Sequence, residues 1–372
     1  MRRVNVLLLI LFTCFVSAAW PQEQTQWRHH KIITFDVPGA GTGANQGTTP
    51  YGINAWGAII GWYTDDSNVN YGFLRTPDGD ITKFDAPGAG TGSGQGTIAF
   101  GMNTWGLIVG ISTDNSGVVH GFVRNPWGGI KTFDAPGAGT GSGQGTWYTS
   151  INDAGEISGG AVDESNVIFA FVLAPDGNYA TFEAPGAGTG YFQGTDTPTF
   201  YGLNLAGTMT GWYIDGNNAY HGYVRSRGGR LTTFDDPKAT TGPQQGTQPF
   251  SVNPEGAVVG QYYDASNISH GFLRSREGKI TNFDAPGAAG GTFVASNNAA
   301  GEITGPYADS KGNVHSFIRA RDGKFTEFDA PGAVYGTYSF GNNAAGEVMG
   351  NYIDANGVYH GFLRRADDEH GR

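Results

Sequence analysis

Short apolar runs alternate with clusters of glycine and small polar residues along almost the whole chain. Segments such as GAIIGWY at 57–63, YGFLR at 71–75 and DITKF at 80–84 have the length of single β-strands. The residues between them include Asn, Asp, Gly or Pro at regular places, which is typical of tight turns. The pattern predicts an all-β protein in which short strands are joined by hairpins.

This strand pattern is repeated. The segment FDAP, or a variant of it, occurs seven times at spacings of 49, 49, 49, 52, 49 and 45 residues. Such a period is the signature of a repeat protein. Each repeat contains four expected strands, which is the number in one blade of a β-propeller. The FDAP segments begin at Phe35, Phe84, Phe133, Phe182, Phe234, Phe283 and Phe328.

Two polar positions recur in every repeat. The first is an Asn followed three residues later by Gly, which indicates a type I turn with glycine in the left-handed conformation. The second is an Asp whose carboxylate can bond back to its own turn. We interpret both as structural. The asparagines are Asn54, Asn103, Asn152, Asn204, Asn253, Asn298 and Asn343, and the aspartates are Asp65, Asp114, Asp163, Asp215, Asp264, Asp309 and Asp354.

The two ends of the repeat array are complementary. The seventh repeat stops after HGFLRRADDEHGR, where its fourth strand is due, whereas the array starts with an unmatched fourth strand, HKIITFDV. We therefore expect a seven-bladed β-propeller of four-stranded antiparallel blades over residues 31–365, with the N-terminal strand closing the last blade. Residues 366–372 are expected to be a C-terminal tail. A linear solenoid would instead need distinct polar caps.

The N-terminus predicts secretion. Residues 1–19 have the basic start, apolar run and small-residue cleavage site of a signal peptide, and residues 20–30 would form an N-terminal linker. The apolar run is too short to be a secure membrane span, so we expect no transmembrane segment in the mature chain. The only cysteine, Cys14, lies in this run, and Thr13 is a poor residue before a lipidated cysteine. We favour a secreted or cell-surface protein over a lipoprotein.

Composition and charge exclude some partners. The chain has 62 glycines, 13% aromatic residues and only 15% charged residues, which fits a folded core rather than a disordered chain. The formal net charge of −11 becomes more negative once Arg2 and Arg3 are removed with the signal. Nucleic acids and anionic membranes attract basic surfaces, so neither is an expected partner. We expect a monomer.

A glycine-rich segment, TKFDAPGAGTGSGQGT at 82–97, raises the question of a nucleotide site. It lacks the G-x-G-x-x-G spacing, no helical segment follows it, and no Gly-Lys-Ser/Thr is present. All variation in repeat length falls in this connection, between FDAP and the next Asn. We interpret it as the crossover between blades and expect no nucleotide.

Metal binding has a structural alternative at each candidate position. Calcium needs six to eight oxygens, whereas each Asp turn offers one carboxylate, so we expect no cofactor and keep calcium as the alternative. A ring residue follows six positions after each Asp. Histidines on neighbouring blades would lie too far apart to share zinc, and we interpret this position as structural. Its residues are Tyr71, His120, Phe169, His221, His270, His315 and His360.

Functional residues are best sought where the repeats differ. The crossovers vary, and aromatic and amide side chains at a concave mouth would suit sugar or peptide binding. Ordinary loop variation is the alternative. The candidate ligand-binding residues are Trp147, Tyr148, Tyr191, Phe192 and Asp196, with the crossover glutamines Gln46, Gln95, Gln144, Gln193 and Gln245.

The repeat pattern N-x-x-G-x-I-x-G-x-Y-x-D…H-G-F resembles the HAF-type extracellular repeat family. The resemblance covers nearly all of residues 31–365, with HGF in three repeats, HGY at 221–223, HSF at 315–317 and FAF at 169–171. It implies a secreted or surface repeat protein and no established activity. Phe169 and Tyr71 depart from the family's histidine, which weakens any chemical role for that position.

The sequence favours a non-catalytic binding scaffold for an extracellular glycan or protein, acting at the crossover face. One alternative is a polysaccharide hydrolase or lyase with acids at the channel mouth. Another is a structural component of a surface or matrix. No catalytic residue can be named, because no G-x-S-x-G motif occurs and most acids belong to the repeat.

Overall fold

A computed structural model of the chain describes residues 31–198 and 201–366. The expected signal peptide (1–19), the expected linker (20–30) and all but the first residue of the expected tail (366–372) lie outside the described residues. The described part is all-β, as predicted: its elements are strands joined by turns and loops. Within these ranges, no helix has the length and apolar character needed to cross a membrane.

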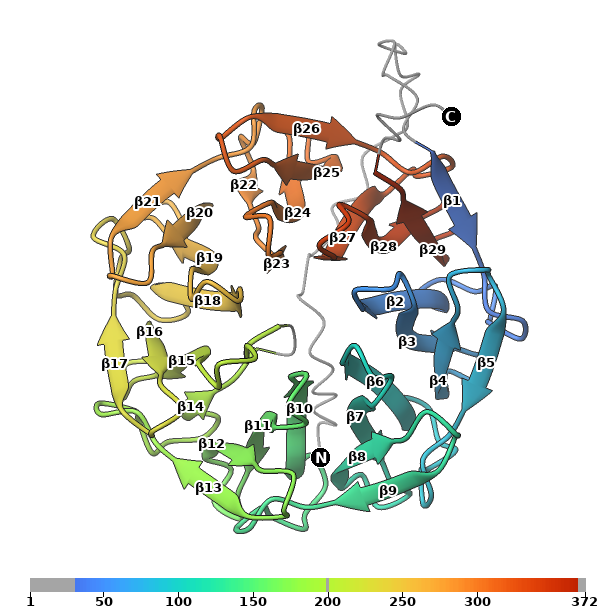
Figure 1. Cartoon of the computed structure of the whole chain (residues 1–372), viewed down its shortest axis with the longest axis horizontal. Coiled ribbons are helices and arrows are strands. Elements are labelled where there is room, and N and C mark those ends of the chain that lie inside the picture. The colour runs from blue at the N-terminus through green and yellow to red at the C-terminus, as the bar shows by residue number, and fades with distance from the viewer. Residues whose placement is uncertain (1–30, 199–200, 367–372) are drawn as a thin grey trace.

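The strands form antiparallel groups in which neighbours in sequence are neighbours in the sheet, as expected for a meander. Figure 1 shows these groups arranged around a common axis. In each group the first strand lies nearest the axis and the last lies at the perimeter. The first groups along the chain are β2 (Gly47–Ile53), β3 (Ile59–Thr64), β4 (Asn70–Arg75) and β5 (Ile81–Phe84); β6 (Gly96–Met102), β7 (Ile108–Thr113), β8 (Val119–Arg124) and β9 (Ile130–Phe133); and β10 (Gly145–Ile151), β11 (Ile157–Val162), β12 (Ile168–Leu173) and β13 (Tyr179–Phe182).

Two of the later groups have irregular inner strands. The strand β14 is only three residues long, and the inner strand of the group that follows β21 is split into β22 and β23. The outer strands keep the regular pattern. These groups are β14 (Gly194–Asp196), β15 (Met209–Ile214), β16 (Tyr220–Arg225) and β17 (Leu231–Phe234); β18 (Thr247–Val252), β19 (Val258–Tyr263), β20 (Ser269–Arg274) and β21 (Ile280–Phe283); and β22 (Gly291–Thr292), β23 (Ser296–Asn297), β24 (Ile303–Ala308), β25 (Val314–Arg319) and β26 (Phe325–Phe328).

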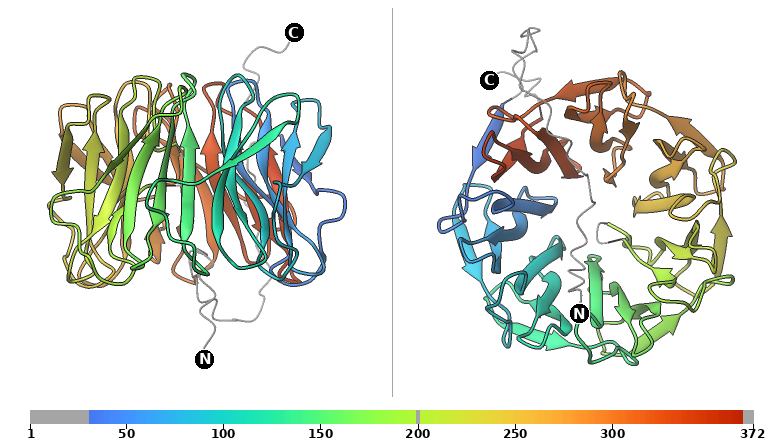
Figure 2. Two further views of the ribbon diagram at one scale, coloured as in Figure 1. Left: turned by 90° about the horizontal axis from the view of Figure 1, so that it is seen from below. Right: turned by 180° about the vertical axis from the view of Figure 1, so that it is seen from behind.

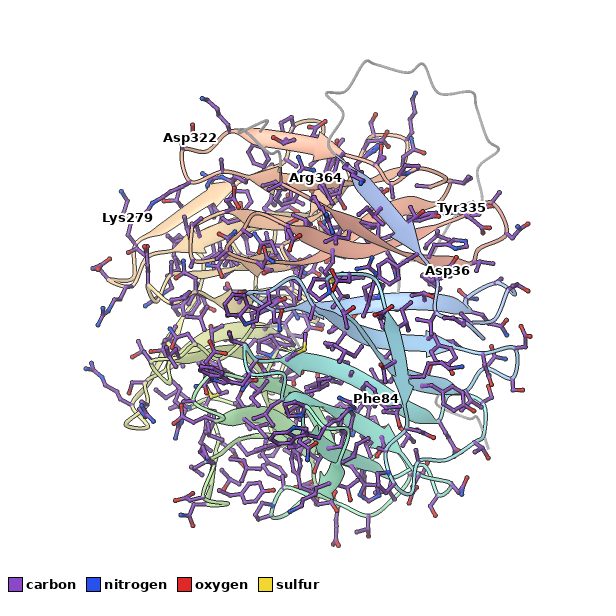
Figure 3. The ribbon with its side chains drawn as sticks, turned by 45° about the vertical axis from the view of Figure 1, so that its right-hand side comes forward. Asp36, Phe84, Lys279, Asp322, Tyr335 and Arg364 are labelled. Carbon is purple, nitrogen blue, oxygen red and sulfur yellow. The ribbon has the colours of Figure 1, made fainter. Side chains whose placement is uncertain are left out.

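The last group joins both ends of the described chain. It contains β27 (Gly336–Asn342), β28 (Val348–Ile353) and β29 (Tyr359–Arg364). The first strand of the chain, β1 (Ile32–Phe35), pairs antiparallel with β29, from Ile32 opposite Arg364 to Phe35 opposite Gly361. Figure 1 shows β1 at the perimeter beside β29, where the other groups have their fourth strand. Arg364 and Asp36 lie at the two ends of this strand pair (Figure 3).

Loops lie at two opposite ends of the molecule, as the side view in Figure 2 shows. Consecutive strands are antiparallel, so alternate connections lie at the same end. One end holds the crossovers between groups together with the Asp turns, such as 65–68. We call this end the crossover face. The other end holds the Asn-x-x-Gly turns, such as 54–57, and the turns between third and fourth strands, such as 76–79. We call it the hairpin face.

The Asn-x-x-Gly turns have the expected hydrogen bonds. In the first of them, Asn54 Oδ1 accepts the backbone N–H groups of Trp56 and Ala58, both at 3.0 Å. Gly57 closes the turn with φ +80°, a conformation that costs glycine little. The Asp turns use the same device, since Asp65 Oδ1 accepts the N–H groups of Ser67 and Val69. Each polar side chain thus satisfies its own turn.

The same asparagines also join successive groups. The Nδ2 of one asparagine donates to the backbone oxygen of the asparagine in the next group, at 2.8–3.4 Å. Asn54 is the exception, because its Nδ2 faces Met102 Sδ at 4.0 Å. The donor–acceptor pairs are Asn103–Asn152, Asn152–Asn204, Asn204–Asn253, Asn253–Asn298, Asn298–Asn343 and Asn343–Asn54.

Aromatic contacts fill the spaces between groups. The FDAP phenylalanine at the end of one outer strand packs edge-on against a buried ring of the next group, as Phe84 does on Phe122 with 6.0 Å between ring centroids. The guanidinium of Arg124 covers the same Phe84 ring at 5.0 Å. Seven such rings, one on each third strand, are fully buried and form much of the core. They are Phe73, Phe122, Phe171, Tyr223, Phe272, Phe317 and Phe362.

The glycine-rich crossover is held by its own side chains. Gln95 Oε1 accepts the N–H of Gly92, and Thr97 Oγ1 accepts the N–H of Ala86. Gly96, with φ +106°, brings its backbone against the preceding group, where a Cβ would lie 2.0 Å from the Asn70 oxygen. Glycine at this position is therefore a requirement of the path between groups.

Candidate functional site

The five crossover glutamines act mainly within their loops. In the first crossover, Gln46 Oε1 accepts the Gly43 N–H at 2.9 Å and its Nε2 donates to Asn68 Oδ1 at 3.1 Å. Gln144 makes the same two contacts, with Gly141 and Asn166. Gln95, Gln193 and Gln245 occupy the corresponding positions. These amides stabilise the crossover face, and a ligand role for them remains a prediction.

The predicted aromatic residues come together between the β10–β13 and β14–β17 groups. Trp147 contacts Tyr148 and Phe192, with ring centroids 5.6 and 6.2 Å apart, in one hydrophobic cluster. Trp147 and Tyr148 are buried, and Tyr148 has the strained φ of +35°. Tyr191 packs on Phe192 and is 64% exposed. Of this set, only Tyr191 offers a large aromatic surface to solvent.

Asp196 is a buried carboxyl group beside this cluster. Its Oδ1 accepts the Thr197 N–H at 2.8 Å, and its backbone oxygen accepts the Tyr223 hydroxyl at 3.0 Å. Burial raises the pKa of Asp196 from 3.8 to about 7, which the Thr197 hydrogen bond opposes. Gly160 borders this carboxyl, because a Cβ placed on it would lie 3.4 Å from Asp196 Oδ1. A perturbed acid of this kind is a functional-site candidate, but this one is enclosed.

Tyr201, a few residues after Asp196, contacts an inner strand of another group. Tyr201 crosses to the β2–β5 group, where its hydroxyl accepts the Ile53 N–H at 3.1 Å and donates to the Ile53 oxygen at 3.2 Å. Burial raises the pKa of Tyr201 to about 12. The cavity beside it measures about 20 Å³, space for one water. Tyr201 therefore fills space beside the inner strands of the first groups.

The histidines at the ring position link two aspartates each. His221 Nδ1 lies 3.0 Å from Asp235, and its Nε2 lies 3.6 Å from Asp215. The ring stacks on Tyr213, with 4.8 Å between centroids. The hydrogen bond that His221 Nδ1–H donates to the Asp235 carboxylate raises the pKa of His221, against the opposing effect of burial. The same arrangement recurs at His120, His270, His315 and His360.

Metal ligands do not converge in the described part of the chain. Within residues 31–198 and 201–366, no three His, Cys, Asp or Glu side chains are placed to hold one ion. The turn aspartates direct Oδ1 at their own backbone, as Asp354 does toward the N–H groups of Asn356 and Val358. Calcium binding therefore remains a prediction that a direct measurement must test.

Exposed tryptophans lie on the hairpin face. Trp56, Trp105 and Trp127 are 71%, 69% and 90% exposed, and they occupy turns of the β2–β5 and β6–β9 groups. Sequence reasoning missed them because it looked for variation in crossover length. The available signal was composition: the Asn-x-x-Gly turns read NAWG and NTWG here, against NDAG, NPEG and NAAG elsewhere.

A groove of about 490 Å³ begins beside Trp105 and runs between the β6–β9 and β10–β13 groups. Leu107, Ile157 and Leu173 form its apolar lining, and Asp153 lies at its side. Cavities of roughly 300–1,000 Å³ are the usual size for small-ligand sites. The groove joins an exposed aromatic ring, an apolar floor and a carboxylate on one face.

No protein-family model matches the chain, and no curated protein matches it in sequence. Solved structures do match. A virginiamycin B lyase from Staphylococcus aureus superimposes with a TM-score of 0.60 at 16% identity, covering 90% of this chain and 99% of the lyase. A lectin from Burkholderia pseudomallei gives 0.56 at 9% identity, over 84% and 94% of the two chains. A puromycin hydrolase gives 0.53 at 14% identity over 82% of this chain and 50% of the hydrolase.

These likenesses establish the fold and nothing more specific. The lyase and the lectin are propeller proteins, so the chain has a β-propeller-like fold. At identities of 9–16%, the activities of these proteins do not transfer to this chain. Enzymes and a lectin share the scaffold, so function has to be argued from the residues of this chain.

Proposed function

We propose that the protein is a secreted, non-catalytic binding scaffold for an extracellular glycan or protein, built on a seven-bladed β-propeller that β1 closes. One observation carries the proposal: Trp56, Trp105 and Trp127 expose most of their indole surface in turns of adjacent strand groups. Exposed aromatic groups are costly in water, and they are enriched where proteins bind ligands or partners.

Ring closure rests on two contacts between the ends of the chain. The pairing of β1 with β29 supplies a fourth strand to the last group. The bond from Asn343 to the Asn54 oxygen repeats the bond that joins other successive groups. A closed ring of seven groups satisfies both, and it leaves the last group with the same short outer edge strand as the others.

The hydrolase or lyase alternative has one favourable observation, the perturbed pKa of Asp196. Substrate access argues against it, because Asp196 is buried. Hydrolysis by a carboxylate pair also needs two acids within reach of one bond. If the alternative holds, Asp196→Asn abolishes turnover of a polysaccharide panel.

The alternative of a structural surface or matrix protein calls for a uniform polar face. The exposed tryptophans of the β2–β5 and β6–β9 groups depart from that uniformity. Tyr191 provides a second possible contact on the crossover face, where the sequence alone suggested binding. We further propose that the mature chain is a monomer without a bound cofactor.

The test is a glycan array combined with a pull-down from extracellular material, using the mature chain. The scaffold function requires specific capture that a Trp56→Ala/Trp105→Ala/Trp127→Ala variant loses. Leu205→Ala is the control, because Leu205 is an exposed apolar side chain, 57% exposed, in the Asn-x-x-Gly turn of the β14–β17 group, one residue before the position equivalent to Trp56 and Trp105. Tyr191→Ala reports on the crossover face. If nothing is captured while a polysaccharide panel is turned over, the scaffold function is wrong.

A further inference from the structure

We propose that the groove beside Trp105 binds a neutral polysaccharide, with one sugar ring stacked on the Trp105 indole. This inference rests on the proposed binding function and goes further by naming the site and the class of ligand. It stands on four features of the hairpin face: a fixed aromatic ring, an apolar groove, an acidic surrounding surface and neighbouring tryptophans.

The Trp105 ring is held in place before any ligand arrives. Its Nε1–H donates to the backbone oxygen of Asp153 at 3.0 Å. Asp153 in turn accepts from Thr104, through the backbone N–H at 2.7 Å and through Oγ1 at 2.9 Å. The edge of the indole is thus tied to the next strand group while most of its surface remains in water. A fixed ring loses little conformational entropy on binding, which favours affinity.

The groove has the mixed character that a pyranose requires. Leu107, Ile157 and Leu173 line it with apolar surface that suits the C–H faces of a sugar. Asn103 and Asp153 also line it, and an exposed carboxylate can accept hydrogen bonds from hydroxyl groups. An aromatic face for stacking and a polar group for the ring edge are both present.

Charge on this part of the hairpin face argues against an anionic ligand. In the hairpin-face turns of the β2–β5, β6–β9 and β10–β13 groups the exposed acidic residues are Asp78, Asp80, Asp153 and Asp176, against one exposed lysine, Lys131, at the start of β9. Exposed basic residues gather on the corresponding turns of later groups, where Lys279 lies at the outer edge of the molecule (Figure 3). An anionic chain would be repelled at the groove, whereas a neutral chain meets no such penalty. The basic residues of the later turns are Arg227, Arg230, Arg276, Lys279, Arg321 and Lys324.

The same observations favour a polysaccharide over a lipid surface. Tryptophans at a membrane interface place a polar N–H among the headgroups. The Trp105 N–H is already bonded to the Asp153 backbone oxygen, and the Asp153 carboxylate is held by Thr104 beside it. Trp105 also stands at the wall of a groove, which admits a chain more readily than a flat bilayer.

Neighbouring tryptophans extend the site beyond one sugar. A Cβ placed on Gly106 would lie 3.6 Å from Pro126, so the turn that carries Trp105 packs against the turn that carries Trp127. Trp56 occupies the equivalent turn of the preceding group. Three indoles on adjacent turns suit a chain of several sugars better than a single monosaccharide.

The experiment is affinity electrophoresis of the mature protein in gels that contain a neutral polymer, either hydroxyethylcellulose or galactomannan. We expect at least one of the two to retard the wild-type protein. Trp105→Ala should weaken the apparent affinity by about tenfold or more, because the stacking surface is lost. Trp105→Phe should restore part of it, and Leu205→Ala should bind as the wild type does. If Trp105→Ala does not fold, Trp127→Ala provides a second variant, because the Trp127 side chain is 90% exposed.

Each outcome decides the proposal. Unchanged retardation of a folded Trp105→Ala protein overturns it, as does the absence of retardation by either neutral polymer. If Trp105→Ala does not fold, unchanged retardation of Trp127→Ala overturns it. Stronger binding to polygalacturonate, or to phosphatidylglycerol vesicles, would assign the face to an anionic glycan or a lipid instead. If the glycan array or pull-down is positive while the neutral polymers fail, the scaffold function stands and only this inference is lost.

Discussion

The side-chain amide of Asn343 donates a hydrogen bond to the backbone oxygen of Asn54 at 3.2 Å, across 289 positions of the sequence. Asn103 makes the same bond to Asn152, also at 3.2 Å, between groups that follow each other directly in the chain. The contact between the two ends of the chain therefore has the chemistry of an internal contact. This equivalence makes closure of the ring measurable.

We predict that Asn343→Ala and Asn103→Ala lower the free energy of unfolding by similar amounts. Each removes one inter-group hydrogen bond and two turn bonds from a buried site, and Asn343→Ala also removes a bond to the Glu347 carboxylate. About 1–3 kcal/mol is expected for each. Urea unfolding measures the effect. A loss for Asn103→Ala without one for Asn343→Ala would mean that the ends are not joined in solution.

Deleting residues 31–37 removes β1 and should destabilise the last strand group. Without its partner strand, β29 would expose its hydrogen-bonding edge and the buried side chains of Phe362 and Leu363. We expect a lower midpoint of thermal unfolding and faster amide exchange in β27–β29 than in β6–β9. Deletion of residues 367–372 serves as the control. Unchanged stability and exchange would refute closure by β1.

Asp196→Asn should stabilise the protein at pH 8 much more than at pH 4. Burial raises the pKa of Asp196 to about 7, so the unfolded chain ionises first as the pH rises above 3.8. Wild-type stability is then lost between about pH 4 and pH 7, by an amount on the order of 4 kcal/mol. Asparagine keeps an oxygen for the Thr197 N–H and does not ionise. Denaturant unfolding from pH 4 to pH 8 tests this, and parallel curves for the two proteins would contradict it.

The double variant His221→Gln/His315→Gln should flatten the remaining pH dependence when made in the Asp196→Asn background. Hydrogen bonds donated to the carboxylates of Asp235 and Asp329 raise the pKa values of His221 and His315. A histidine whose pKa is higher in the folded than in the unfolded protein stabilises the fold at pH values below its unfolded-state pKa of about 6.5. This stabilisation is lost as the pH rises through the folded-state pKa. The background protein should thus be more stable at pH 6 than at pH 8. If the double variant and the Asp196→Asn background show the same pH dependence of stability, that dependence arises from other titratable groups.

The repeat-level features could be predicted from the sequence because each is a local rule applied many times. The Asn and Asp turns follow from side chains that bond to their own backbone, and the crossover glycines follow from the length and composition of one connection. The all-β class, and the role of the N-terminal segment as the fourth strand of the last group, could be predicted from the repeated four-strand pattern alone. The candidate site could not be predicted in the same way. Trp147 and Asp196 look like exposed loop residues in sequence, yet the β10–β13 and β14–β17 groups bury them.

The sequence by itself determined the local structure of a single repeat. This comprises four short strands, turns whose Asn and Asp side chains bond to their own backbone, and a phenylalanine that can pack on a neighbouring group. These depend on residues a few positions apart. Only the tertiary structure decided which side chains face water, because burial at Asp196 and Tyr201 arises where groups distant in sequence pack around the axis. It also decided that Trp105 is held by Asp153 of the neighbouring group with its ring exposed. Exposure is a property of the assembled groups, and no single repeat specifies it.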